Sequence, residues 1–125
     1  MISDIMLCDV IKLKPEEDLK KALSIMDSNK INGAPVVGEN DKLVGMLVKA
    51  DIYRFLMEDG HYDTCPVDWV MTKNVITASK SETIDSVAQK LIDNEIVAIP
   101  VVDGDLVVGL ASIEEVLKHY VSKNI

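Results

Sequence analysis

The stretch NKINGAPVV, at residues 29–37, returns in altered form as NEIVAIPVV at residues 94–102. Both copies have an asparagine, an isoleucine two residues later and a closing Pro-Val-Val, at an offset of 65 residues. Self-similarity at a fixed spacing is the sequence signature of an internal structural repeat. The chain is therefore predicted to contain two copies of one supersecondary unit.

The repeat extends in both directions from this stretch. On its N-terminal side the same offset aligns three further pairs: Met6 with Met71, Glu17 with Glu82, and Met26 with Leu91. On its C-terminal side the second copy is one residue shorter, so the offset becomes 64 and Gly45 aligns with Gly109. The alignment predicts a first repeat over residues 1–58, a linker over 59–65 and a second repeat over 66–122.

Each repeat is predicted to have the element order β-α-β-β-α. A brief β-branched strand (10–13 and 75–77) precedes a helix whose apolar residues recur at i, i+3, i+4 and i+7. Pro15 followed by two glutamates, and Ser79 with Glu82 at the spacing of a capping box, indicate where these helices begin. Two strands joined by a turn-prone loop come next, at 34–37 with 43–48 and at 99–102 with 106–111, and a second helix closes each repeat at about 50–57 and 113–120.

The size of one repeat predicts how the two are arranged. A unit of about 60 residues buries so little apolar surface that it would be only marginally stable alone. We therefore expect an α/β fold of the α+β kind, in which two pseudo-twofold-related repeats pack sheet to sheet and form two equivalent clefts. Because 48% of the residues are hydrophobic and only 4% are aromatic, the core should be aliphatic.

Composition and charge narrow the classes of function. The net charge of −8 is shared equally by the two halves, which disfavours nucleic acid and anionic membranes as partners. The longest apolar stretches, such as 96–102, are far shorter than the roughly 20 residues that span a bilayer, and the N-terminus lacks a basic region before an apolar run. We expect a cytoplasmic protein with free thiols at Cys8 and Cys65 and no room for a catalytic domain.

Several short motifs occur in a fixed order. Asp-x-Met stands near the start, and an apolar strand ends in Pro-Val-Val. The hairpin then returns into a strand with a glycine, Gly45 or Gly109, which is followed six residues later by an acidic residue, Asp51 or Glu115. In the order and spacing of these motifs, each half of the chain resembles a cystathionine-β-synthase (CBS) domain. From Ile2 to about Ser122 the chain resembles two such domains in tandem, as in a Bateman module. The resemblance implies a regulatory module, frequently dimeric, that binds AMP, ADP, ATP or S-adenosylmethionine.

The ligand motif of that family is G-h-x-[ST]-x-x-D, in which the hydroxyl and the helix N-terminus suit a phosphate and the aspartate suits a ribose. The first repeat has Asp51 but places Val48 where the hydroxyl belongs. The second repeat has the hydroxyl of Ser112 but places the longer Glu115 where the aspartate belongs. Each predicted cleft is thus half-matched.

The resemblance also implies which residues face each other across the clefts. The first cleft would combine Asp51, Met46 and Val48 with Asn74, Ile76, Ile96 and Val97. The second would combine Ser112, Glu115 and Leu110 with Asp9, Ile11, Ile31 and Asn32. The first is favoured, because Glu115 is longer by a methylene group and Asp9 would repel phosphates.

The missing hydroxyl at Val48 favours ligands with little phosphate, although Lys49, Lys73 and Lys12 could offset the deficit. Plainer explanations remain open for the same side chains. Asp51 and Glu115 could simply stabilise the first turn of a helix, and Ser112 could be an N-cap.

No catalytic set is found in the sequence. His61 and Cys65 lie in the linker without a third group, so they are expected to be loop residues rather than a nucleophile or a metal site. The chain is therefore predicted not to be an enzyme and to need no catalytic cofactor. The leading hypothesis is a sensor that binds an adenosine compound, forms a homodimer and regulates a protein in trans. The alternative is an interaction scaffold with degenerate clefts, which would use the outer-helix residues Tyr53, Phe55, Leu56, Leu117, Tyr120 and Val121.

Overall fold

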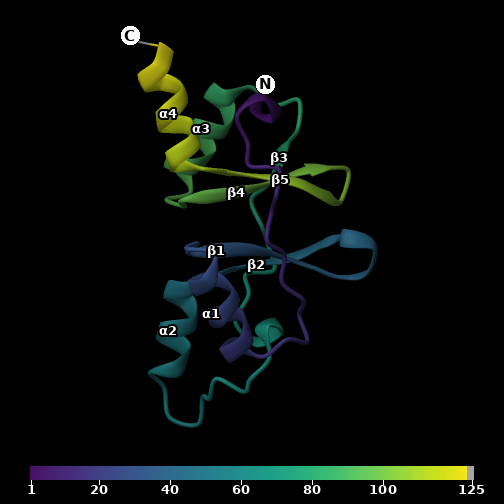
Figure 1. The fold of residues 1–125 in the computed structure, drawn as a ribbon, viewed down its shortest axis with the longest axis vertical. Coiled ribbons are helices and arrows are strands. Elements are labelled where there is room, and N and C mark those ends of the chain that lie inside the picture. The colour runs from purple at the N-terminus through teal and green to yellow at the C-terminus, as the bar shows by residue number, and fades with distance from the viewer. Residues whose placement is uncertain (124–125) are drawn as a thin grey trace. The chain divides into compact units, whose positions relative to one another are not determined.

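The computed structural model describes residues 1–123, which divide into two compact units (Figure 1). The first-hairpin unit spans Ile11–Val75. The second-hairpin unit combines Met1–Val10 with the chain from Ile76 onward. Each unit has a small sheet and two α-helices, so the predicted α+β class is confirmed.

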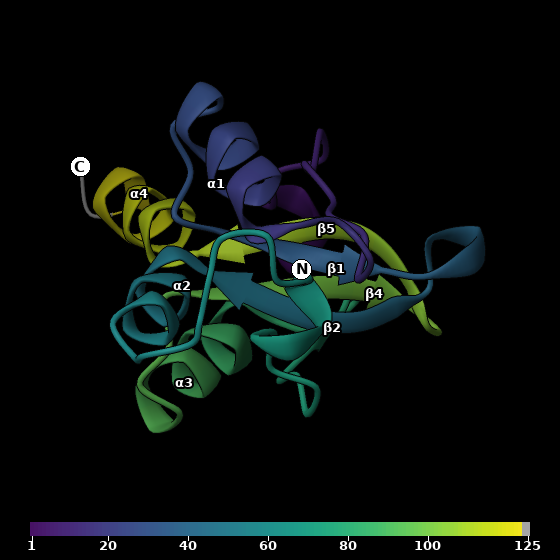
Figure 2. The same cartoon turned by 90° about the horizontal axis from the view of Figure 1, so that it is seen from below.

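The first-hairpin unit is built on two antiparallel strands, β1 (Gly33–Val37) and β2 (Leu43–Val48). Helix α1 (Leu19–Ser28) precedes the hairpin and α2 (Lys49–Leu56) follows it. Both helices lie on the same face of the sheet (Figures 1 and 2). Leu13 adds a single parallel bridge to β1, which is all that forms of the strand predicted at 10–13.

The second-hairpin unit repeats this order. Strands β4 (Ala98–Asp103) and β5 (Leu106–Ser112) form the hairpin, and the short β3 (Ala78–Ser79) pairs in parallel with β4. Helices α3 (Ile84–Asp93) and α4 (Ile113–Lys123) flank the hairpin in sequence and pack on one face of the sheet (Figure 1). The strand predicted at 75–77 thus forms slightly later, at 78–79.

The predicted starts of the first helices are wrong by about one turn. Helix α1 begins after Asp18, whose carboxylate accepts a hydrogen bond from the Lys21 N–H at 2.7 Å. Helix α3 begins after Thr83, whose hydroxyl accepts from the Ser86 N–H at 3.1 Å. The glutamates that suggested earlier starts close turns instead, because the Glu17 and Glu82 carboxylates accept from the N–H of the residue three positions before them.

Each unit has its own aliphatic core. The apolar stripe predicted on the first helix faces inward, with Leu19, Ala22 and Met26 fully buried. The matching stripe of α3 buries Val87 and Leu91. The strands contribute small and aliphatic side chains, among them Val36, Leu47, Ile99 and Val101, as the low aromatic content predicted.

The segment Met1–Val10 packs on the hairpin of the second repeat rather than on that of the first. Leu7 and Leu110 exchange two backbone hydrogen bonds, at 2.9 and 3.0 Å, and the buried Ile2 donates its N–H to the Glu82 carbonyl at 2.7 Å. The equivalent segment before Val75 packs on the first hairpin in the same way, with Thr72 and Met46 bonded at 2.8 and 2.9 Å. Each unit therefore takes its leading segment from the other sequence repeat.

Candidate ligand-binding site

Each predicted site is organised at the junction where a hairpin strand ends and a helix begins. In the first-hairpin unit the Lys49 N–H donates to the Asn32 carbonyl at 2.8 Å. In the second-hairpin unit the Ile113 N–H donates to the Val97 carbonyl at 2.9 Å. The two junctions share this backbone frame, so any difference between them must come from the side chains.

Asp51 lies in the first turn of α2. Its side chain is 29% exposed, and its carboxylate accepts a hydrogen bond from the guanidinium of Arg54, one turn along the same helix. Val48, immediately before the helix, supplies no side-chain hydrogen bond to the helix start, and Met46, two residues earlier in β2, is buried. This junction therefore presents a carboxylate beside apolar side chains and lacks the hydroxyl that would suit a phosphate.

The three lysines considered for a phosphate are each held by an aspartate. Lys49 pairs with Asp27, and its side chain is only 17% exposed. Lys12 lies 3.3 Å from a carboxylate oxygen of Asp41, and Lys73 lies 3.7 Å from one of Asp68. Because an ion pair offsets part of the charge of its lysine, these side chains add little to the attraction of a highly phosphorylated ligand.

The Ser112 junction is arranged differently. The Glu115 side chain folds back onto the start of α4, where its Oε1 accepts from the Ser112 N–H at 3.0 Å and from the Ser112 hydroxyl at 2.6 Å. The spacing Ser-x-x-Glu is that of a capping box, and it is readable in the sequence. The hydroxyl predicted for a phosphate is thus already donated to a carboxylate of the chain.

The remaining predicted contacts divide between the units. Residues of the first cleft fall into both, with Met46, Val48, Asp51 and Asn74 in the first-hairpin unit and Ile76, Ile96 and Val97 in the second. Residues of the second cleft also fall into both, with Leu110, Ser112, Glu115 and Asp9 in the second-hairpin unit and Ile11, Ile31 and Asn32 in the first. Within the first-hairpin unit, Lys49 at the start of α2 is bonded to Asn32, which was predicted for the second cleft. Within the second-hairpin unit, Ile113 at the start of α4 is bonded to Val97, which was predicted for the first cleft.

The exposure of these residues varies. Val97 and Ile76 are exposed aliphatic side chains, and Asn74, Asp9 and Asn32 are exposed polar ones. Ile31 and Ile96 are half-buried, each packed against the core of its own unit, and Ile11 is also half-buried. Leu110 is buried at the end of its strand. The exposed aliphatic side chains are of the kind that could contact a flat aromatic base.

His61 and Cys65 do not lie in a catalytic arrangement. The His61 ring stacks on Phe55, with ring centroids 3.9 Å apart, and its Nδ1 lies 2.9 Å from the Phe55 carbonyl at the end of α2. Cys65 packs half-buried against the core, and Cys8 is exposed. Within residues 1–123 no group of three or more His, Cys, Asp or Glu side chains is placed to hold a metal ion, and no helix there is long and apolar enough to cross a membrane.

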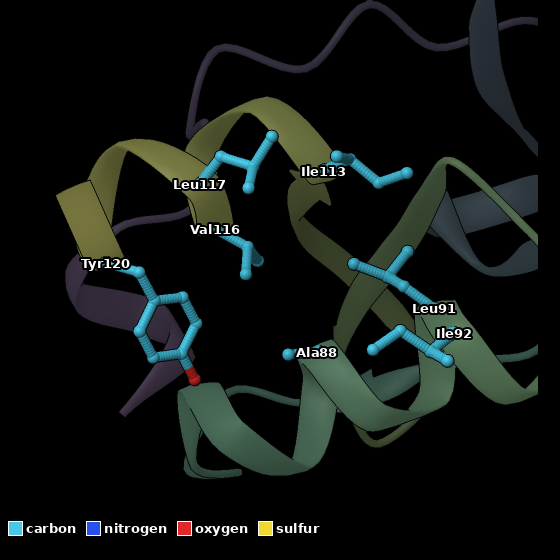
Figure 3. A pocket seen from close by; sticks show the side chains of 7 residues that line it. All are labelled: Ala88, Leu91, Ile92, Ile113, Val116, Leu117 and Tyr120. Atoms are coloured by element: carbon cyan, nitrogen blue, oxygen red, sulfur yellow. The ribbon is translucent and has the colours of Figure 1, made fainter.

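A groove that the sequence analysis did not anticipate lies between α3 and α4 (Figure 3). Its volume is about 250 Å³, and its lining is Ala88, Leu91, Ile92, Ile113, Val116, Leu117 and Tyr120. Leu117 and Tyr120 had been named as outer-helix residues, and Leu91 as the counterpart of Met26 in the repeat. The Tyr120 hydroxyl donates to Asp85, and this hydrogen bond raises the pKa of Tyr120. In the first repeat, Asp27 and Lys49 stand at the positions of Ile92 and Ile113, so an ion pair replaces two apolar side chains.

Comparison with known proteins gives a consistent result. The CBS domain model matches residues 2–58 and 67–122. A homoserine O-acetyltransferase of Methanococcus vannielii is 33% identical over 93% of this chain, and an inosine-5′-monophosphate dehydrogenase of Aquifex aeolicus is 36% identical over 91%. The chain spans only about a quarter of the length of these relatives, 24% and 23%.

Solved structures resemble the chain over a larger share of their length. The CBS domain pair of protein MJ0100, in complex with 5′-methylthioadenosine and S-adenosyl-L-methionine, has a TM-score of 0.90 and 31% identity, and the match covers 98% of this chain and 97% of the other. Protein MJ1225 of Methanocaldococcus jannaschii has a TM-score of 0.89 and 30% identity, over 95% of this chain and 47% of that protein.

Proposed function

The chain belongs to the CBS domain family, as two CBS domains in tandem, and we propose that it is a regulatory module that binds an adenosine-containing ligand and acts in trans on a partner protein. The observation that carries the proposal is the likeness to the MJ0100 pair, which extends over nearly all of both chains and includes a complex with two adenosine compounds. The enzyme activities named for other relatives belong to proteins of which this chain spans about a quarter. We propose no catalytic role for the chain itself.

Asp51 is the proposed anchor for the ribose. Two carboxylate oxygens can accept hydrogen bonds from two neighbouring hydroxyls, and Arg54 holds this carboxylate in a half-exposed position at the start of α2. The other proposed contacts of this ligand are the apolar or polar side chains of Met46, Val48, Asn74, Ile76, Ile96 and Val97.

The chemistry near Asp51 favours an adenosine thioether or sulfonium compound over a nucleoside di- or triphosphate. Val48 places an aliphatic side chain where a hydroxyl would assist a phosphate, and the nearby Lys49 is already paired with Asp27. The net charge of −8 adds a general repulsion of polyanions. A ligand such as 5′-methylthioadenosine carries no phosphate and presents an apolar 5′ substituent.

Isothermal titration calorimetry with 5′-methylthioadenosine, S-adenosylmethionine, AMP, ADP and ATP tests the proposal. We expect measurable binding of the first two and weaker binding as phosphates are added. Equal or tighter binding of ATP would overturn the preference for a ligand without phosphate. The absence of heat with every compound at millimolar concentration would overturn the sensor function itself.

A second candidate function, homodimer formation or docking of a partner on the α3/α4 groove, is favoured by the exposed apolar lining. Ile92 is 69% exposed and Leu117 is 56% exposed, so water contacts a continuous apolar surface between the two helices (Figure 3). If a second copy covers this surface, contact would remove several apolar side chains from water in each protomer.

Sedimentation velocity tests the second candidate. The double variant Ile92→Asp with Ile113→Lys installs in α3 and α4 the residues that stand at the matched positions of α1 and α2, and we expect it to dissociate a dimer. Tyr62→Asp, which changes an exposed residue beyond α2, is the control and should leave the dimer intact. A monomeric wild-type chain would exclude the homodimer, and a dimer indifferent to all adenosine compounds would favour a scaffold over a sensor.

A further inference from the structure

The two helix starts differ in what occupies them. At α4 the Glu115 carboxylate accepts from both the N–H and the hydroxyl of Ser112, at 3.0 and 2.6 Å. At α2 the shorter Asp51 carboxylate is bonded to Arg54, one turn further along, and Val48 provides no hydroxyl. The carboxylate of the second-hairpin unit therefore lies on the start of its own helix, whereas Asp51 points along the helix to a side chain.

This arrangement has a direct consequence for ligand binding. The start of an α-helix attracts an anion because its first N–H groups lack partners within the helix. Glu115 supplies that anion from within the chain and also takes the one hydroxyl at the junction. A ribose or phosphate group would have to displace a charge-assisted hydrogen bond of 2.6 Å and share the position with a negative charge. At α2 the Asp51 carboxylate is bonded to the Arg54 side chain rather than to the helix start, and Val48 has no hydroxyl to be taken.

We propose that Glu115 is a specificity-determining residue that closes the start of α4 to ligand, so that the chain binds a single adenosine ligand, at Asp51. This inference rests on the proposed function and specifies its stoichiometry. The extra methylene group of Glu115 is the chemical cause, because it lets the carboxylate reach back to Ser112. Shortening that side chain releases the Ser112 hydroxyl and frees the helix start.

Calorimetric titration with 5′-methylthioadenosine and with AMP, on the full chain and four variants, tests the inference. We expect one high-affinity ligand per chain for the wild type, none of high affinity for Asp51→Ala, two for Glu115→Asp and one for the double variant Asp51→Ala with Glu115→Asp. Glu114→Asp shortens a neighbouring exposed glutamate that pairs with Lys118, and should leave the stoichiometry at one. Circular dichroism of each variant verifies that the helices remain formed.

Two results would overturn the inference while leaving the proposed function in place. One is a wild-type stoichiometry of two, of which Asp51→Ala removes a single ligand. The other is a Glu115→Asp variant that still binds one ligand. If the wild type binds nothing, the proposed function fails, but a ligand gained by Glu115→Asp would still support the blocking role of Glu115, and no gain would refute it.

Discussion

In the first-hairpin unit the helix after the hairpin starts at Val48 and Lys49, and in the second-hairpin unit the equivalent helix starts at Ser112 and Ile113. The same backbone hydrogen bond, to Asn32 in one unit and to Val97 in the other, positions both helices. The side chains nevertheless make opposite arrangements, an uncapped start beside an aspartate and a start closed by Glu115. The backbone frame of a repeat is therefore independent of the side chains at its helix start.

The same holds for the outer helices. Asp27 and Lys49 form an ion pair at the positions where Ile92 and Ile113 line an apolar groove. The exchange of these two residues thus makes the surface polar in one unit and apolar in the other. Both helix pairs nevertheless pack on their sheets through buried aliphatic residues. The two units are equivalent as folding units and different as surfaces.

The largest expected effect concerns the leading segments, which each unit takes from the other repeat. Ile2 and its equivalent Val67 are both fully buried. Ile2→Ala should lower the free energy of unfolding by about 2–5 kcal/mol, because it removes three carbon atoms from a packed core. Val67→Ala should cost less, about 1–3 kcal/mol, because it removes two. Urea unfolding measures both, and a negligible loss for Ile2→Ala would show that Met1–Val10 is not part of the second core.

The two helix starts should respond differently when their carboxylates are removed, as measured by the affinity for ligand. Loss of hydrogen bonds between a charged carboxylate and the ligand should weaken binding of 5′-methylthioadenosine by about 1.5–3 kcal/mol. Glu115→Ala should leave the affinity at the Asp51 position unchanged, because Glu115 bonds within its own helix start. Calorimetry gives both values. An equal loss for the two variants would contradict the assigned asymmetry.

Gly45 and Gly109 allow close approach of the leading segments. A Cβ atom at Gly109 would lie 2.3 Å from the Met6 sulfur and 3.0 Å from the Leu7 carbonyl oxygen, and one at Gly45 would lie 2.6 Å from the Met71 sulfur. Either alanine variant should therefore cost about 1–3 kcal/mol by overpacking, with Gly109→Ala the costlier. Gly38→Ala, whose new atom would lie 3.3 Å from a Val44 side-chain carbon, is the control in the unfolding measurement and should cost less.

The smallest expected effect is a pH dependence confined to the second-hairpin unit. Burial would raise the pKa of Glu82, but hydrogen bonds from Ser86, Lys90 and the Ser79 N–H outweigh it and lower that pKa. A carboxyl whose pKa is lower in the folded state stabilises the fold above its ordinary pKa of 4.5, and this contribution is lost as the pH falls through the lowered value. Glu82→Gln should therefore be less stable than the wild type at neutral pH, with the difference narrowing below pH 4.5 in unfolding titrations. If the stability difference between Glu82→Gln and the wild type did not change with pH, it would not arise from the lowered pKa of Glu82.

Much of the fold was predictable because its signals are local. The repeated strand ending in Pro-Val-Val, the turn-prone loops and the helical spacing of Leu19, Ala22 and Met26 are all short-range patterns that secondary structure obeys. The first helix was placed too early because Pro15 and the glutamates after it belong to a preceding turn, in which the Glu17 carboxylate accepts from the Lys14 N–H. The second was placed too early because the spacing of Ser79 and Glu82 suits both a capping box and a preceding turn. Asp18 and Thr83, which are the N-caps in the structure, are also residue types that favour an N-cap, and they indicated the later helix starts.

The candidate site was less predictable, because its side chains bond to partners that are distant in the sequence. Lys49 pairs with Asp27 from another helix, and Lys12 pairs with Asp41. Neither pairing follows from spacing. The Ser112–Glu115 bond is the exception, because its Ser-x-x-Glu spacing is visible in the sequence and is that of a capping box. The prediction had left the phosphate role and the N-cap role of Ser112 both open.

The duplication, the element order, the aliphatic core and the two unequal motifs at Val48–Asp51 and Ser112–Glu115 are all visible in the amino-acid sequence. These follow from periodicity and residue type, which act over a few neighbouring positions. Three other features are visible only in the folded chain: Met1–Val10 packs on the second hairpin, an apolar groove opens between α3 and α4, and the nearby lysines are paired with aspartates. Those outcomes depend on backbone hydrogen bonds and packing between residues far apart in the chain, and the folded arrangement selects them.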